Sequence, residues 1–363
     1  MYRFIVVTIP IIVLAAIIAI FSYTFGYQTK LIRGLTYFGA TREERRVLHK
    51  EIAKRSQFIQ PFLLILKLLT RGSLNKSPRY KNLAYPPQVC NQTTFAFAEN
   101  YQPKKNDIFV ATQMKCGTTW MQQIVFEVLS RGRGDLSDTG YRHLQAVSPW
   151  IESCQGVSVA EAPLIGDSAS RIIKTHLPTK LCPYSPQARY IYVARHPVSC
   201  FASTYDFQHA LTGSLAADKD TALAWFCSDA MHWGPWPDHV AGWWDWAETR
   251  ENVLFMHYEE MKDDLKGAIG KVAAFLNQSL TEAELDAIEG KCSFEYMRHN
   301  EDMFEMAPPS ILAGKRTLFK SGARDRHKDI LPEQHDQILH HCRERLQGRC
   351  YPVAKYYPDI RSG

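Results

Sequence analysis

A short polar loop between an apolar run and an amphipathic segment is the part of this 363-residue chain that most clearly suggests chemistry. In order, its residues are Lys115, Cys116, Gly117, Thr118, Thr119 and Trp120. A strand, a tight loop and a helix N-terminus direct backbone N–H groups and the positive end of a helix dipole at one point, where a phosphate can bind. Lys115 adds a cation and the two threonines add hydroxyl donors. The loop predicts a site for a phosphorylated ligand, although it lacks the order of a Walker A motif. A strand, turn and helix without a ligand is the alternative.

A histidine follows a second apolar run, in the segment Lys174-Thr-His-Leu-Pro178. An ordinary imidazole has a pKa of ~6.5, so neutral His176 could accept a proton near pH 7. Lys174 places a positive charge beside it. The segment predicts His176 as a general base, and the alternative is a histidine that only forms hydrogen bonds within a turn.

An arginine and a serine stand eight residues apart after a third apolar run. Arg195 directly follows residues 189–194, and Pro197 suits the first position of a helix. Ser203 then falls about two turns into that helix, on roughly the same side as Arg195. A guanidinium and a hydroxyl can hold a second phosphate. The alternative is an arginine that is merely solvated at the start of a helix.

A sheet must bring these three segments together. Apolar runs predict strands at 107–112, 171–174, 189–194 and 253–257, and helical spacing predicts helices near 118–130, 197–209, 221–232, 238–250, 259–276 and 281–290. This alternation indicates an α/β fold with a P-loop-like central parallel sheet flanked by helices on both faces. Ligands bind at the carboxyl ends of the strands in such sheets, and all three segments begin there, so we expect one site.

The order of these motifs resembles that of the soluble, cytosolic-type sulfotransferases, over about residues 107–335. The resemblance implies a sulfotransferase domain at 107–355 that moves a sulfuryl group from 3′-phosphoadenosine 5′-phosphosulfate (PAPS) to an acceptor hydroxyl or amine, without an obligatory metal. It implies that the Lys115 loop binds the 5′-phosphosulfate and that Arg195 and Ser203 hold the 3′-phosphate. We expect Lys115 and Lys174 to stabilise charge during transfer, and Ser203 to hold Lys115 away from the donor until the acceptor binds.

Further binding residues are implied by the same resemblance. Tyr258 matches a tyrosine that contacts adenine, Phe294 matches a phenylalanine that stacks on it, and Lys320-Ser321-Gly322 matches part of the loop over the 3′-phosphate. Two departures concern binding. Cys116 replaces a serine, which removes one hydroxyl donor, and Lys320 replaces an arginine, which removes a bidentate fork. Weaker binding of the 3′-phosphate would follow.

Two other functions stay compatible with the sequence alone. One is a P-loop nucleotide or phosphoryl transferase. The other is a membrane-bound, non-catalytic nucleotide-binding protein, and the departures from the family motif at 320–328 are compatible with it. The acceptor is equally open. Six of the eight tryptophans fall between residues 225 and 246, where Trp233 and Trp236 either pack in the core or line an acceptor pocket.

The N-terminal residues suggest a membrane anchor. Residues 4–25 carry no charged side chain, and a bilayer-spanning helix needs ~20 apolar residues. We therefore expect a transmembrane helix within 1–25, a basic or amphipathic juxtamembrane segment and linker at 26–106, and a catalytic domain in the cytoplasm because basic residues follow the span. Residues 58–69 look like an amphipathic helix on the membrane or the domain. An anchored enzyme favours a lipid or other apolar alcohol as its small-molecule acceptor.

Composition excludes little else. The net charge of +6 suits an anionic ligand but is too diffuse to predict binding to nucleic acid. The nine cysteines include no C-x-x-C pair, so neither a disulfide framework nor a metal site is expected. The sequence does not indicate an oligomeric state.

Overall fold

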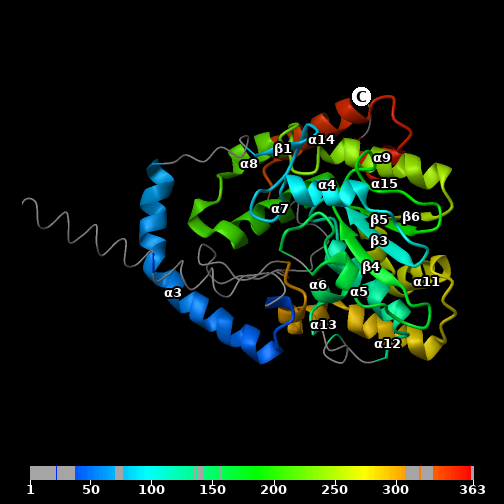
Figure 1. The fold of residues 1–363 in the computed structure, drawn as a ribbon. Helices are drawn as coiled ribbons and strands as arrows, with labels where there is room; N and C mark the ends of the chain where they lie inside the picture. Colours follow the sequence, from blue (N-terminus) through cyan, green and yellow to red (C-terminus); the bar gives the residue numbers. More distant parts are fainter. Residues whose placement is uncertain are drawn as a thin grey trace, which may run out of the picture.

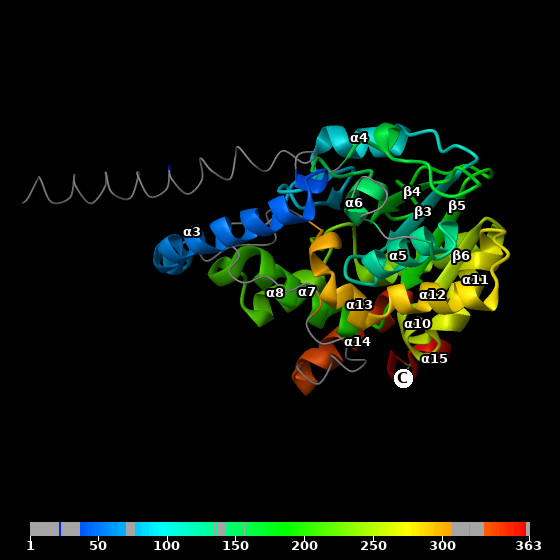
Figure 2. The same ribbon diagram turned by 90° about the horizontal axis from the view of Figure 1, so that it is seen from below.

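The computed structural model of the chain describes residues 22, 37–69, 77–133, 136, 142–155, 157–306, 319 and 330–360. The side chains of 58–69 and 214 lie outside that description. Within it, helices cover both faces of a central sheet (Figures 1 and 2). The predicted α/β class with a parallel sheet is confirmed.

The sheet has four parallel strands in the order β4-β3-β5-β6. These strands are β3 (Asp107–Thr112), β4 (Arg171–Thr175), β5 (Arg189–Ala194) and β6 (Val253–His257). The four predicted strands agree with these bounds to within one residue. Because β3 pairs with both β4 and β5, the loop after β3 lies between the ends of its two neighbours, where His176 and Arg195 begin their loops.

Alternate side chains of the strands enter two separate apolar cores, as the period of two in a strand requires. Phe109 and Tyr192 enter the core shared with α4 (Gln92–Asn100), α7 (Pro197–Thr212), α9 (Trp236–Thr249) and α14 (Pro332–Leu346). Val110 and Ile191 enter the core shared with α5 (Thr118–Leu129), α11 (Leu265–Phe275) and α12 (Glu282–Cys292). Both faces of the sheet are therefore buried, which explains why the strands read as continuous apolar runs.

Three predicted helices correspond to single helices of similar extent, which are α5 (Thr118–Leu129), α7 (Pro197–Thr212) and α9 (Trp236–Thr249). The helix predicted at 281–290 is α12 (Glu282–Cys292), which Thr281 caps with Glu284 in a capping box. Four further helices are α6 (Leu144–Val147), α13 (Phe294–His299), α14 (Pro332–Leu346) and α15 (Val353–Tyr356).

Two helix predictions need correction. The helix predicted near 221–232 is α8 (Lys219–Phe226), which begins at the cap Asp218 and ends before the turns that lead to Gly234. The helix predicted at 259–276 is two helices, α10 (Tyr258–Asp263) and α11 (Leu265–Phe275). Asp264 leaves the helical region between them and caps α11 by accepting a hydrogen bond from the N–H of Gly267 at 2.7 Å. The helical spacing of apolar residues continues across Asp264, so the sequence pattern did not predict the break.

The predicted linker is more regular than expected. Residues 77–106 contain the hairpin β1 (Arg79–Tyr80) and β2 (Leu83–Ala84), followed by α4 (Gln92–Asn100). Leu83 and Phe95 are buried in the core that also receives Phe109. This segment packs against the sheet.

A long helix, α3 (Arg42–Leu69), precedes the hairpin and extends along one side of the molecule (Figure 1). An ion pair and hydrogen bonds hold its first turns. Arg42 pairs with Asp302 at 2.5 Å, and Arg45 donates to the carbonyl oxygens of Ala40 and Arg142 at 2.6 and 2.8 Å. The amphipathic segment predicted at 58–69 is the last part of α3, and its side chains are not described.

The predicted localisation, a single-pass membrane protein with a cytoplasmic catalytic domain, is contradicted. Among the residues that the structure describes, no helix combines the length and the apolar character needed to cross a bilayer. The predicted anchor at 1–25 lies outside the described residues except for Ser22.

Candidate active site

The loop between β3 and α5 has the backbone shape of an anion cradle. Lys115 and Gly117 have positive φ angles of 63° and 103°, and Gly117 is the residue before the first turn of α5. The first N–H groups of a helix have no partner within it. A Cβ on Gly117 would lie 2.8 Å from the Tyr258 ring, so only glycine lets the loop take this path beneath that ring.

The side chains of the loop do not all face the same way. The Cys116 thiol is fully buried, 3.6 Å from the Cys200 sulfur, and burial raises its pKa well above the ordinary value. Cys116 can therefore offer a ligand only its backbone. The hydroxyl of Thr118 lies 2.6 Å from that of Thr112, whereas Thr119 is half-buried in the first turn of α5.

His176 lies directly against the loop that begins at Thr112. Its Nδ1 is 2.9 Å from the carbonyl oxygen of Thr112, and a carbonyl only accepts, so Nδ1 carries the hydrogen. The ring centre is 5.1 Å from that of Trp150 and 4.9 Å from that of Trp233. Burial, and then the charge of Lys174, hold the pKa of His176 well below its ordinary value. The imidazole is thus neutral near pH 7, with its lone pair on Nε2.

Lys174 is a fully buried ammonium group. Its Nζ lies 4.0 Å over the Trp150 ring and 3.9 Å from the Met306 sulfur, and no carboxylate of the described residues pairs with it. Burial lowers the pKa of Lys174 to about 8, against the opposing effect of Glu152. A buried cation without an oxygen partner is costly, so this position suits an anionic ligand.

Arg195 connects the third segment to the loop. Its Nη1 donates to the carbonyl oxygen of Lys115 at 3.1 Å, and its guanidinium lies 4.4 Å over the Tyr258 ring. Its Nε is buried and has no hydrogen-bond partner among the described residues. Trp236 fixes the backbone here, because its indole N–H donates to the Arg195 carbonyl oxygen at 3.0 Å. Trp236 and Trp233 are both buried in the same core, and Trp233 also contacts His176.

The ammonium group of Lys115 lies 4.3 Å over the ring of Phe207 on α7. Ser203, the residue expected to restrain Lys115, is buried one turn before Phe207 on the same helix. Phe207 is a residue that motif spacing did not identify.

Aromatic residues continue the site beyond Gly117. The rings of Trp120 and Tyr258 meet edge to face at 5.4 Å, and the indole N–H of Trp120 donates to the Cys292 carbonyl oxygen at 2.8 Å. Phe294, the first residue of α13, is 37% exposed, and its ring centre lies 6.2 Å from that of Phe319. The predicted loop residues Lys320, Ser321 and Gly322 lie outside the described residues.

The structure therefore places the Lys115 loop, His176 and Arg195 together. Thr112 contacts His176 at the start of the loop, and Lys115 contacts Arg195 within it. Glu152, Trp150 and Met306 also belong to this site, and sequence reasoning missed them because they are isolated residues on loops, outside any spaced motif.

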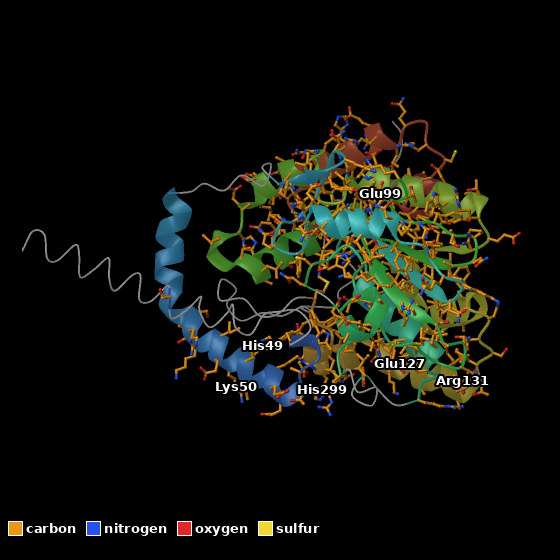
Figure 3. The ribbon with its side chains drawn as sticks, in the orientation of Figure 1. His49, Lys50, Glu99, Glu127, Arg131 and His299 are labelled. Carbon is orange, nitrogen blue, oxygen red and sulfur yellow. The ribbon has the colours of Figure 1, made fainter. Side chains whose placement is uncertain are left out.

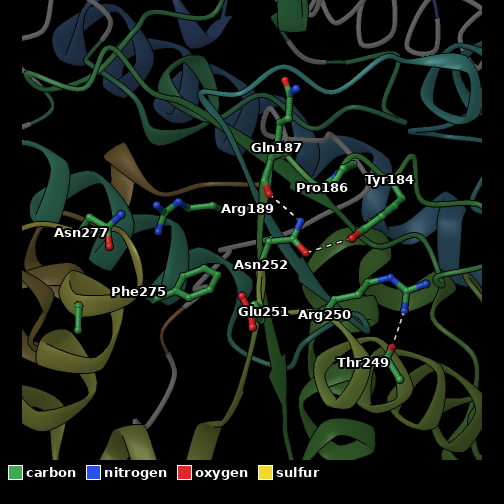
Figure 4. Close-up of a pocket in the computed structure, with 12 residues that line it drawn as sticks. Tyr184, Pro186, Gln187, Arg189, Thr249, Arg250, Glu251, Asn252, Phe275 and Asn277 are labelled. Atoms are coloured by element: carbon green, nitrogen blue, oxygen red, sulfur yellow. Dashed lines mark hydrogen bonds between the residues drawn. The ribbon is translucent and has the colours of Figure 1, made fainter.

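A separate groove of about 660 Å³ lies at the amino ends of β5 and β6, the edge opposite the site (Figure 4). Arg189, Arg250 and Asn252 are among its lining residues. None of the predicted site residues lines it.

A parallel α/β sheet with an anion-binding loop at its carboxyl edge is typical of nucleotide-binding proteins. Residues 105–349 match the family model described as a sulfotransferase domain. The chain belongs to the sulfotransferase family.

Individual relatives agree with that assignment. The chain is 34% identical over 226 residues to Sulfotransferase 1C2 of Oryctolagus cuniculus, which covers 59% of this chain and 73% of that relative. It is 29% identical over 248 residues to Sulfotransferase 2B1 of Homo sapiens, covering 66% of each.

Solved structures show the same fold. Mouse sulfotransferase SULT7A1 complexed with PAP is similar with a TM-score of 0.58 at 21% identity, over 78% of this chain and 97% of that one. Retinol dehydratase in complex with androsterone and inactive cofactor PAP also gives a TM-score of 0.58, at 20% identity, over 72% and 87% of the two chains. The chain is thus an enzyme that transfers a sulfuryl group from PAPS, and the phosphoryl transferase and the non-catalytic binding protein are not supported.

Proposed function

We propose that His176 is the general base of this sulfotransferase and that the Lys115 loop, Lys174 and Arg195 hold the PAPS donor beside it. One observation carries the proposal: the segment from Thr112 to Thr118 contacts His176 at one end and, through the Lys115 carbonyl, Arg195 further on. We propose residues 107–355 as the sulfotransferase domain, with residues 77–106 packed against it.

The donor would occupy the cradle formed by Lys115, Cys116, Gly117, Thr118, Thr119 and Trp120. Two features fit a doubly anionic nucleotide: the start of α5 at Gly117, which no side chain caps, and the buried Nε of Arg195, which has no hydrogen-bond partner among the described residues. Arg195 and Ser203 would hold the 3′-phosphate. Tyr258 and Phe294 would contact the adenine, and Lys320, Ser321 and Gly322 are proposed for the loop over the 3′-phosphate.

His176 would take the proton of the acceptor hydroxyl or amine. The Thr112 carbonyl holds the proton on Nδ1, so the lone pair is on Nε2, and burial keeps the ring neutral near pH 7. A positioned general base contributes about a hundred- to ten-thousand-fold in rate.

The two lysines would stabilise charge on the transferred group. PAPS supplies the activated sulfuryl group, and preorganised cations in a water-poor site stabilise the charge that develops as it moves. Lys174 is held in the site by Trp150. Lys115 lies over Phe207, so Phe207 together with Ser203 would hold its ammonium away from the donor until the acceptor arrives.

The acceptor would be a small molecule with an apolar body. Trp150 and Trp233 flank the His176 ring and offer flat apolar surfaces to such a molecule. Among the relatives, the 3-alpha-hydroxysteroid sulfotransferase of Cavia porcellus is 29% identical over 257 residues. We propose an apolar alcohol or phenol as the acceptor class.

Transfer of ³⁵S from labelled PAPS tests this proposal. The purified chain is incubated with apolar alcohols, phenols and saccharides in parallel, and labelled products are separated from the donor. We expect labelled apolar products from wild type and none from Lys115→Ala. Label transferred only to saccharides would contradict the acceptor class, and the absence of any transfer from a folded wild type would contradict the activity.

A further inference from the structure

Glu152 is a fully buried carboxylate beneath the end of β4. Its Oε1 accepts a hydrogen bond from the backbone N–H of His176 at 2.6 Å, and its Oε2 accepts one from the Thr175 hydroxyl at 3.0 Å. The segment that carries it is paired to the same strand, because Lys174 donates its N–H to the Pro149 carbonyl oxygen at 2.9 Å and accepts from the Ile151 N–H at 3.0 Å. Glu152 is therefore fixed against the peptide that joins Lys174 to His176.

The hydrogen-bond pattern favours the ionised form of Glu152. Both described partners donate, so both carboxylate oxygens act as acceptors, as an ionised carboxylate does. Burial raises the pKa of Glu152, and these donors oppose that effect. Burying a charged carboxylate costs desolvation free energy. A nearby positive charge would account for a carboxylate at this position.

Lys174 is that nearby positive charge. The titratable groups that face it are Glu152 from the segment after α6, Cys90 from the segment before α4, and His176 from its own strand end. Burial keeps the Cys90 thiol neutral by raising its pKa, and His176 is neutral as well. Among the described residues facing Lys174, Glu152 is thus the one negative charge available.

We propose that Glu152 is a positioning residue that keeps Lys174 protonated and fixes the peptide bearing His176. The proposal rests on the roles proposed above for Lys174 and His176. No atom of Glu152 needs to touch the donor or the acceptor, because it acts through the charge of one residue and the backbone of the other.

The consequence is a specific dependence on pH. An opposite charge nearby favours the protonated amine, so removing the charge of Glu152 lets Lys174 lose its proton at lower pH. Turnover should then fall on the basic side at a lower pH than in wild type. A residue that only supported the fold would lower turnover at every pH alike.

The test compares Glu152→Gln, which removes the charge, with Glu152→Asp, which moves it back by one methylene. Glu127→Gln is the matched control, because Glu127 is equally buried but lies on α5 and pairs with Lys291 at 3.7 Å (Figure 3). The protonation of Lys174 is followed by NMR of protein labelled with ¹³C at the lysine Cε, with its signal assigned by its absence in Lys174→Arg. The pH dependence of kcat is measured on the same variants.

We expect the Lys174 titration midpoint to fall in the order wild type, Glu152→Asp, Glu152→Gln, and kcat at pH 8 to fall about tenfold in Glu152→Gln with a smaller loss at pH 6.5. Glu127→Gln should keep the wild-type midpoint. If Glu152→Gln does not fold, the Lys174 titration midpoint in Glu152→Asp alone tests the proposal. An unchanged midpoint in the folded Glu152 variants would overturn the proposal. Because NMR needs no turnover, that result is distinct from failure of the proposed function, which would appear as wild type without sulfuryl transfer.

Discussion

Nδ1 of His176 donates a hydrogen bond to the carbonyl oxygen of Thr112 across 2.9 Å, so the last residue of β3 sets the tautomer of a ring that follows β4. This single contact joins the start of the anion-binding loop to the proposed base. It also leaves Nε2 as the nitrogen that can accept a proton.

Replacing His176 with alanine should separate chemistry from donor binding. Loss of a general base costs about a hundred- to ten-thousand-fold in kcat, while the Lys115 loop and Arg195 are untouched. We therefore expect kcat to fall in that range and the calorimetric Kd for adenosine 3′,5′-bisphosphate to stay within about twofold. His340→Ala, on the exposed face of α14, is the control and should behave as wild type. Unchanged turnover in His176→Ala would remove His176 from the mechanism.

Turnover should stay nearly constant at acidic pH and should fall above about pH 8. Activity needs neutral His176 and protonated Lys174. Because burial depresses the pKa of His176 well below ~6.5, the base stays deprotonated at pH 6, whereas Lys174, with a pKa of about 8, loses its proton above that pH. Measurements of kcat from pH 5.5 to 9.5 should show the decline on the basic side. A constant rate to pH 9.5 would argue against the role of Lys174.

Gly117→Ala should weaken both the fold and donor binding. The backbone there has a φ of 103°, and the added Cβ would lie 2.8 Å from the Tyr258 ring, so strain of order 1–3 kcal/mol is expected. Thermal unfolding and nucleotide titration measure the two effects. Gly290→Ala is the matched control, because its Cβ would meet nothing within 4 Å in α12 and should stabilise by roughly 0.5–1 kcal/mol. If the two variants had the same stability and the same nucleotide affinity, the Gly117 backbone would not be strained by a side chain.

Phe207→Leu should release Lys115. The ring attracts the ammonium at 4.3 Å, an interaction of about 0.5–2 kcal/mol that leucine cannot make. With the acceptor omitted, we expect the variant to hydrolyse PAPS about threefold or more faster than wild type. Phe207→Tyr keeps an aromatic face and should hydrolyse at the wild-type rate. If leucine and tyrosine give the same rate, Phe207 does not restrain Lys115.

Much of this fold could be predicted because both faces of its sheet are buried. That burial makes β3, β4, β5 and β6 continuous apolar runs between helical patterns, and the motif residues follow directly from the strand ends. The break at Asp264 was not visible, because a capping aspartate can equally lie within a helix. Glu152 and Met306 come from segments distant in sequence from the motifs. Phe207 lies one turn after Ser203, but its contact with Lys115 depends on how α7 packs against the loop.

The N-terminal residues show the limit of a hydropathy argument. Residues 4–25 have the length and composition of a span, which led to the contradicted localisation. Cys116 shows a different limit. The sequence placed Cys116 in the binding loop, at the position of a serine that donates to the ligand, yet its side chain packs against Cys200. A motif fixes the backbone path, while the direction of each side chain depends on what packs beside it.

The central claim is that the Lys115 loop, Arg195 and His176 surround one molecule of donor. A crystal structure with adenosine 3′,5′-bisphosphate tests this most directly. We predict one nucleotide in contact with both the 115–120 loop and Arg195, with the free side of its 5′-phosphate facing Nε2 of His176. A nucleotide bound instead in the groove at the amino ends of β5 and β6, or one that contacts the loop without Arg195, would contradict the account.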